Sequence, residues 1–424
     1  MVAISVVLRP FLTRLSDSFI VHGKPLPKHP CVLDGNGVVL PIASFLVHRA
    51  VNRNAASGTV LDEAYILRDW LIFLQHDDRD IWEINDDALR RFAVTGLASG
   101  ASPRRVQRKV STIFNFYWVS QHHLGLVDGL ISDPQSIDSD GKSALTADLS
   151  FRRRKDGKTI VKPRAIYGFT TVPSSRARPT PTEEQIERVL DHLLASPNSE
   201  RAICYWLCAR WMNEAGLRRS GVSGLTIGSI ENALLREGIR HENGGPVPIQ
   251  HLFSDIVRQN SLLLGLSSLK RSGRSNLFVS VVEKRGKQRF APVPICLIEC
   301  TLAYVWQQRS GLCAARGWQQ PDPLFLSLKT GNALQPGAIG NAIKGAFNHQ
   351  NVAGSGHRLR AAFTTRRVRT AVQRARGRHG RAFDVAGVLL EEAEALGHQR
   401  PNTLRPYIDA AVVEEALLND YTDD

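Results

Sequence analysis

The sequence contains little of what would mark a membrane protein, a disulfide-stabilised protein or a metalloenzyme. Among its 424 residues, no apolar run approaches the roughly 18 residues that a membrane-spanning helix needs. The six cysteines include no C-x-x-C pair and no histidine nearby at metal-ligand spacing. No P-loop is present, and the acidic stretches DDRD (77–80) and EEAE (391–394) fit solvated helix ends better than metal sites. These absences predict a reduced cytoplasmic protein that uses no membrane, metal or cofactor.

Acidic residues are also in short supply. The chain has 54 Lys+Arg against 40 Asp+Glu, a net charge of +14 and a pI near 9.8. Nine arginines and no acidic residue fall between His357 and Arg381, whereas a solvated helix face usually mixes both signs. A polyanionic partner is therefore expected, and nucleic acid is the first candidate.

A hydrophobic fraction of 43% and a charged fraction of 22% predict a globular chain. Its length of 424 residues predicts two or three domains. Residues 1–55 contain scattered Pro, Gly and Asn, which indicates an irregular arm. Residues 56–150 have helical periodicity, and 151–180 form a basic, Pro/Ser-rich stretch typical of a linker. A second domain over 181–424 is expected to contain an elaboration at about 232–276.

Three helices are predicted in the first of these domains. One follows Thr59, one begins at the Asn85/Asp86 cap, and one begins at Ser102-Pro103. The third helix combines an apolar stripe with a basic group that is a candidate DNA-binding surface: Arg104, Arg105, Arg108 and Lys109. An ordinary amphipathic surface helix explains this pattern equally well.

The second domain is predicted to be mainly helical with a small β-hairpin, which makes it an α+β fold. Thr182 and Gln185 form a capping box before a helix, and alternating apolar residues flank a Lys-Arg-Gly-Lys turn within 277–294. No internal repeat is found.

Four stretches of this domain contain residues suited to chemistry. They are AGLRRSGVSGL with Arg218, VEKRGKQRFAPVP with Lys284, HRLRAAFTT with His357 and Arg360, and LGHQRPNTLRPYIDA with His398 and Tyr407. His357 and Arg360 are spaced to share one face of a helix. Taken singly, each stretch has an ordinary structural explanation, such as a surface salt bridge for the arginine or solvent exposure on a β-turn for the lysine.

In their order along about 190 residues, the four stretches together resemble the tyrosine recombinase (phage integrase) family. They are similar to that family's first arginine box, lysine hairpin, H-x-x-R box and Leu-Gly-His box followed by the nucleophilic tyrosine. The helical residues 59–125 resemble the family's DNA core-binding (SAM-like) domain in pattern only. The resemblance thus implies a helical core-binding domain followed by a tyrosine recombinase catalytic domain.

The resemblance also implies a role for each residue. Arg218 and Arg360 would bind the scissile phosphate, Lys284 would be the general acid and His357 the general base. His398 would hydrogen-bond the phosphate, and Tyr407 would form a 3′-phosphotyrosine. Because that ester stores the energy of the broken bond, no ATP or metal is required. Arg366 and Arg367 on the arginine-rich helix are further DNA-binding candidates.

Three features depart from the family pattern. Gly221 stands where an acidic residue usually follows the first arginine by three positions. The segment from Arg218 to Lys284 is long, which leaves Lys287 as a rival for the general acid. Pro406 directly precedes Tyr407 and disfavours helix before it.

The expected activity is site-specific DNA recombination or integration for a mobile element, by a nucleoid-associated enzyme. Its expected partners are double-stranded DNA, three further copies in a synaptic tetramer, and accessory DNA-bending or element-encoded proteins. The apolar tail beyond Tyr407 would dock on a neighbouring copy or on its own domain. Two alternatives remain open: a catalytically silent DNA-binding protein with this fold, and a type IB topoisomerase.

Overall fold

The computed structural model divides the chain into two compact units, Met1–Pro173 and Ser174–Asp424. Each unit has a hydrophobic core of its own. The structure describes residues 9–132, 144–153, 159–165, 180–283, 286, 288–319, 321–379, 384–396, 404–405, 407–409 and 411–412. None of the helices in these ranges is long and apolar enough to cross a membrane.

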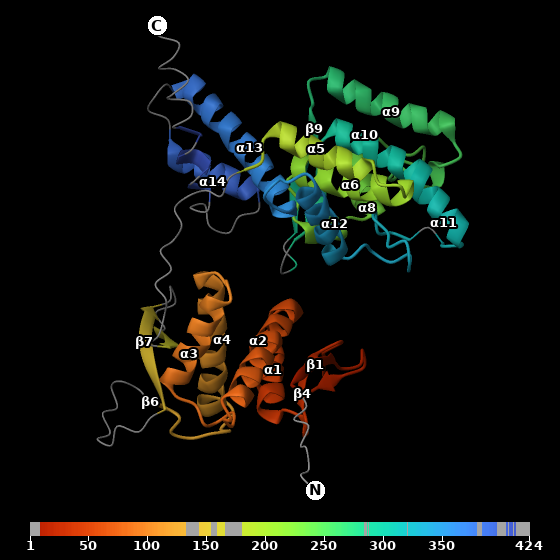
Figure 1. Ribbon diagram of the computed structural model, residues 1–424. Helices are drawn as coiled ribbons and strands as arrows, with labels where there is room; N and C mark the ends of the chain where they lie inside the picture. Colours follow the sequence, from red (N-terminus) through yellow and green to blue (C-terminus); the bar gives the residue numbers. More distant parts are fainter. Residues whose placement is uncertain are drawn as a thin grey trace. The chain divides into compact units, whose positions relative to one another are not determined.

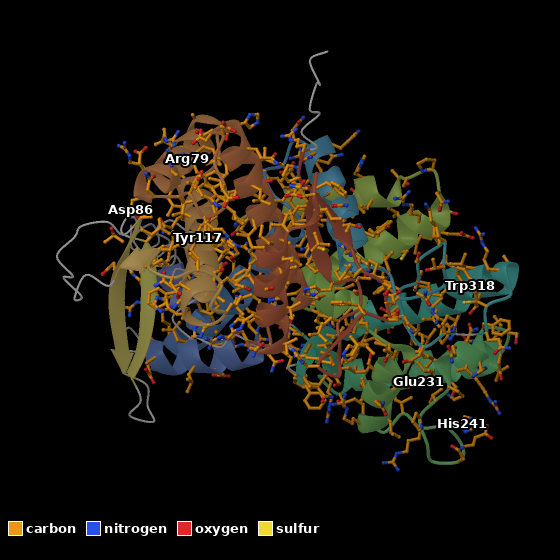
Figure 2. The ribbon with its side chains drawn as sticks, turned by 90° about the horizontal axis from the view of Figure 1, so that it is seen from below. Arg79, Asp86, Tyr117, Glu231, His241 and Trp318 are labelled. Atoms are coloured by element: carbon orange, nitrogen blue, oxygen red, sulfur yellow. The ribbon has the colours of Figure 1, made fainter. Side chains whose placement is uncertain are left out.

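The described part of the first unit is built on four helices. They are α1 (Leu40–Val51), α2 (Ser57–His76), α3 (Asp86–Ala98) and α4 (Pro103–His122). The last three confirm the predicted helices, and the Asn85 side chain caps α3 by accepting from the Ala88 amide. The core contains Tyr117, labelled in Figure 2, whose hydroxyl accepts from Trp70 Nε1 and donates to the Ile81 carbonyl, both at 2.7 Å. These two bonds satisfy a buried hydroxyl and fix α4 against α2.

Strands complete the first unit in stretches for which the sequence predicted an irregular arm, part of a helical domain or a linker. They are β1 (Phe11–Arg14), β2 (Ile20–Val21), β3 (Lys24–Pro25), β4 (Pro30–Asp34), β5 (Gly37–Val38), β6 (Ile131–Ser132), β7 (Leu145–Arg153) and β8 (Thr159–Ala165). Residues 11–51 thus form strands and α1 rather than an irregular arm, and β8 pairs with β7 inside the expected linker. Strands of two to five residues, as β1 to β5 are, are too short to show clear alternation in the sequence.

The second unit is mostly helical, as predicted. Its helices are α5 (Glu183–Leu194), α6 (Ser199–Glu214), α7 (Arg219–Ser223), α8 (Ile227–Arg236), α9 (Ile256–Arg271), α10 (Ile295–Tyr304), α11 (Ser310–Arg316), α12 (Pro336–His349), α13 (Gly356–His379) and α14 (Val385–Ala395). A 3₁₀ turn (Ile249–Leu252) and a π-helical segment (Val305–Arg309) lie between them. The capping box of Thr182 and Gln185 starts α5, as predicted. Residues 232–276 contain the 3₁₀ turn and α9, which packs against α10.

The predicted hairpin is present as β9 (Asn276–Val282) and β10 (Gln288–Pro294). The strands pair antiparallel, with Val282 opposite Gln288 and Ser280 opposite Phe290. Alternate residues of β9 enter the core while the others remain exposed, which is the period-two pattern of a half-buried strand. The register places Glu283 at the end of β9, on the buried side of the hairpin.

Helix α13, the arginine-rich segment, crosses α6 and carries α14 beside it (Figure 1). A separate apolar cluster joins α13 and α14 to the described C-terminal residues. Its members are Phe363, Val368, Val372, Leu389, Ala393, Leu396, Leu404, Ile408 and Ala411. This packing holds the segment around Tyr407 against α13.

Candidate active site

The turn that carries Arg218 begins at a glycine with a left-handed backbone. Helix α6 ends at Glu214, and Gly216 follows with φ of +63°. A Cβ on Gly216 would overlap the ring of Phe363 from α13, so both the backbone angle and the space require glycine. The turn brings Arg218 to the N-cap position of α7, where its side chain is 29% exposed.

Arg218 forms an ion pair with Glu283, at the end of β9. Glu283 is only 7% exposed and also accepts from two other arginines. Its Oε1 lies 3.1 Å from Arg289 Nη2 and 3.3 Å from Arg360 Nη1, while Oε2 is the partner of Arg218. Three guanidinium groups from α7, β10 and α13 thus converge on one carboxylate, and the cluster carries more positive than negative charge.

Arg360 is the most deeply held of the three and lies on α13 with His357. It is 6% exposed, and besides Glu283 it donates to the backbone carbonyls of Gly216 and Leu396, the latter at 2.7 Å. His357 lies three residues earlier, at the first turn of α13, and its side chain remains accessible at the surface. Arg360 and Arg218 thus share the carboxylate of Glu283, and the roles predicted for them and for His357 remain predictions.

Burial, followed by the surplus of positive charge, lowers the pKa of two site residues. Burial, and then the charge of Arg218, lower the pKa of Arg360 to about 10, although Glu283 opposes the shift. The pKa of His357 is lowered by desolvation first and then by the charges of Arg219, Arg218, Arg360 and Arg358. A neutral imidazole beside guanidinium groups can accept a proton, and the arginines are stabilised by any anion that enters the cluster.

Tyr407 packs, half-buried, against the apolar cluster of α13 and α14. Its amide donates to the Leu404 carbonyl at 2.9 Å. The Arg360 bond to Leu396 ties the end of α14 to the arginine cluster, two residues before His398. Lys284, its rival Lys287 and His398 lie outside the described residues.

No family model matches the chain, and no curated protein sequence matches it. The chain does match solved structures. The XerH site-specific recombinase, in a post-cleavage complex with a palindromic difH substrate, is 15% identical with a TM-score of 0.51, covering 88% of this chain and 82% of its own. The chain has the fold of the tyrosine recombinases.

Other members of this fold superpose less well. The Tn1549 transposon integrase, in complex with transposon right-end DNA, is 14% identical with a TM-score of 0.45, covering 89% of this chain and 98% of that one. A lambda integrase dimer bound to a COC′ core site is 10% identical with a TM-score of 0.41, covering 87% and 76%.

The four basic residues predicted to bind DNA from α4 differ in whether they form ion pairs within the described part of the chain. Arg104 and Arg105 are exposed. Arg108 pairs with Asp62 at 2.8 Å and Lys109 with Asp69 at 3.0 Å, both across to α2. Phosphate contacts by Arg108 or Lys109 would have to replace these ion pairs.

Arg366 and Arg367 of α13 also have partners within the chain. Arg366 donates to Glu183 at 2.7 Å and to Asn213, and Arg367 donates to the buried Glu392 at 2.7 and 3.1 Å. These contacts tie α13 to α5, α6 and α14. Their role as DNA-binding residues remains a prediction.

The residues missed from the sequence are Glu283 and Arg289. Both lie in the quoted hairpin motif, and the alternation of β9 and β10 could have placed them on its inner face. The available signal was a glutamate that this alternation places on the buried face of the hairpin, beside a suspected anion site. Among the described residues, no group of three or more His, Cys, Asp or Glu side chains is arranged to hold a metal ion.

Proposed function

We propose that this protein is a site-specific DNA recombinase or integrase of a mobile element, which cleaves and rejoins DNA through a 3′-phosphotyrosine. The observation that carries this proposal is the convergence of Arg218, Arg289 and Arg360 on the single carboxylate of Glu283, beside His357. Buried positive charge in excess of negative charge is costly unless an anion binds. A phosphodiester is an anion of the right chemistry, and charge grows on its non-bridging oxygens during attack.

In the proposed reaction, Arg218 and Arg360 hold the phosphate and His398 donates a further hydrogen bond to it. The Tyr407 hydroxyl attacks phosphorus while its proton passes to the neutral His357. The bond from phosphorus to the 5′-oxygen breaks, and Lys284 protonates that oxygen. Attack by a 5′-hydroxyl from another strand reverses these steps and releases Tyr407.

The exposed Arg104 and Arg105 on α4 support a duplex-binding role for the first unit. Phosphate contacts of this kind supply affinity without reading sequence. A synaptic tetramer and accessory proteins are part of the proposal, by analogy with enzymes of this fold.

Covalent capture tests the proposal. The full-length protein is incubated with duplexes that carry a nick and either a randomised centre or the DNA that flanks the gene. We expect an adduct that survives a denaturing gel and whose DNA, when sequenced, defines one preferred site. Tyr407→Phe should give no adduct. Failure of the wild-type protein on every duplex, or an adduct from Tyr407→Phe, would contradict the mechanism.

A preference for one DNA site distinguishes the proposed recombinase from a type IB topoisomerase. Relaxation of supercoiled plasmid without any preferred site would identify a topoisomerase instead. Duplex binding without an adduct would identify a silent DNA-binding protein.

A further inference from the structure

One buried carboxylate, that of Glu283, occupies the centre of the arginine cluster and pairs with Arg218. Gly221, three residues after Arg218, offers no side chain for such a pair. Glu283 approaches instead from the end of β9, a strand that is separated from α7 in the sequence by about 60 residues. Its two oxygens are divided between the arginines, with Oε2 on Arg218 and Oε1 on Arg289 and Arg360.

We propose that Glu283 is a positioning residue that holds Arg218 and Arg360 in the geometry required for phosphate binding, in place of the acid missing at position 221. The inference rests on the proposed function of the site. It also links the arginines to the lysine hairpin, because Glu283 directly precedes Lys284 in the chain. A single side chain would therefore hold arginines from three elements of the catalytic unit.

The exposure of the side chains distinguishes a positioning role for Glu283 from an alternative, in which its carboxylate only occupies the place of a phosphate. The side chain of Glu283 is 5% exposed and that of Arg289 is 8% exposed, whereas that of Arg218 is 29% exposed. The carboxylate thus lies beneath Arg218, and the accessible side of the guanidinium is left for a ligand. A carboxylate that merely occupied the place of a phosphate would lie on that accessible side.

The fixed geometry has a physical consequence for catalysis. A long arginine side chain at the edge of a site retains several rotamers unless another group restricts it. An anionic partner below the guanidinium restricts Arg218 before DNA arrives, so less ordering is required during the reaction. Arg360 has backbone partners as well, at Gly216 and Leu396, and depends less on Glu283.

The test uses the full-length protein with Glu283→Gln, which keeps the shape and removes the charge. Glu63→Gln is the matched control, because Glu63 is also 7% exposed and binds an arginine, Arg49, through both oxygens. On the duplex selected by covalent capture, we expect Glu283→Gln to bind within about two-fold of wild type but to form adduct about 100-fold more slowly in single turnovers. Glu63→Gln should leave the adduct rate unchanged.

Arginine side-chain NMR of the free protein supplies a readout that does not need catalysis. The guanidinium signals of Arg218, assigned by their loss in Arg218→Lys, should be sharp in wild type and broadened in Glu283→Gln. This measurement separates failure of the positioning role from failure of the proposed function, in which wild type gives no adduct. Unchanged Arg218 signals would overturn the inference.

Two kinetic outcomes would also overturn it: an adduct rate for Glu283→Gln equal to wild type, or a faster one, as expected if the carboxylate competes with phosphate. If Glu283→Gln does not fold, Glu283→Asp decides. It keeps the charge but shortens the reach by one methylene, and we expect a slower adduct rate at unchanged affinity. A wild-type rate in this variant would overturn the inference equally.

Discussion

Arg360 Nη2 donates a hydrogen bond to the backbone carbonyl of Leu396 at 2.7 Å. The bond joins the H-x-x-R box on α13 to the leucine of the Leu-Gly-His box, which directly follows α14. A second link, from Arg367 to the buried Glu392, lies one turn back along α14. The position of the C-terminal segment with Tyr407 is therefore coupled to the arginine that is proposed to bind the phosphate.

The Arg367–Glu392 pair should stabilise the contact between α13 and α14. Glu392→Gln leaves Arg367 without a charged partner, and because Arg367 is 31% exposed we expect a loss of only about 1–2 kcal/mol in the free energy of unfolding. Hydrogen exchange should quicken in Val385–Ala395 and stay unchanged in α6. Equal protection of α14 in the variant and the wild type would contradict this role.

Gly216 should tolerate no side chain. Gly216→Ala combines a left-handed backbone angle with overlap on Phe363, and it disturbs the carbonyl that Arg360 uses. Gly317→Ala is the matched control, since Gly317 has φ of +65° and open space around its Cβ. Urea denaturation should show Gly216→Ala less stable than the control by about 1–3 kcal/mol. Similar losses in both variants would mean that packing against Phe363 contributes nothing.

The rate of adduct formation should fall at acidic pH, because His357 then becomes protonated and can no longer accept a proton. Its pKa is lowered from 6.5, so the ring is neutral at pH 7 and gains a proton only as the pH falls through a value below 6.5. The rate of the free enzyme should therefore be flat near neutrality and decline below that value. His357→Gln should be slow and lack this decline. A wild-type rate that falls with decreasing pH no more than the rate of His357→Gln would contradict the role of His357 as base.

Arg104 and Arg105 should contribute to duplex affinity through phosphate alone. Replacing both with Ala should lower the slope of log affinity against log salt by about two, with no change in the preferred site. Fluorescence anisotropy at several salt concentrations measures this slope. An unchanged slope would show that this end of α4 does not touch DNA.

The sequence was sufficient for the longer elements and for part of the site. Helical periodicity and caps located α2, α3, α4 and α5, and the alternation around the Lys-Arg-Gly-Lys turn located the β9–β10 hairpin. The structure brings Arg218, His357 and Arg360 close together, and their catalytic roles stay predictions. Glu283 was missed because two of its partners, Arg218 and Arg360, come from distant segments, and only tertiary packing brings them to the carboxylate that it shares with the nearby Arg289.

The first 55 residues show a different limit of the sequence. Strands of two to five residues, separated by turns, give no periodicity that a window can detect, yet Val32 of β4 is fully buried in the core of the first unit. Packing against α1 and α2 rather than local propensity forms this sheet.

The most direct test of the account is to identify the residue that carries DNA in the captured adduct. Nuclease and protease digestion followed by mass spectrometry should find a nucleotide joined through its 3′-phosphate to Tyr407. The adduct should persist in Tyr421→Phe and vanish in Tyr407→Phe. Attachment at Tyr421 or at any other side chain would contradict the central claim.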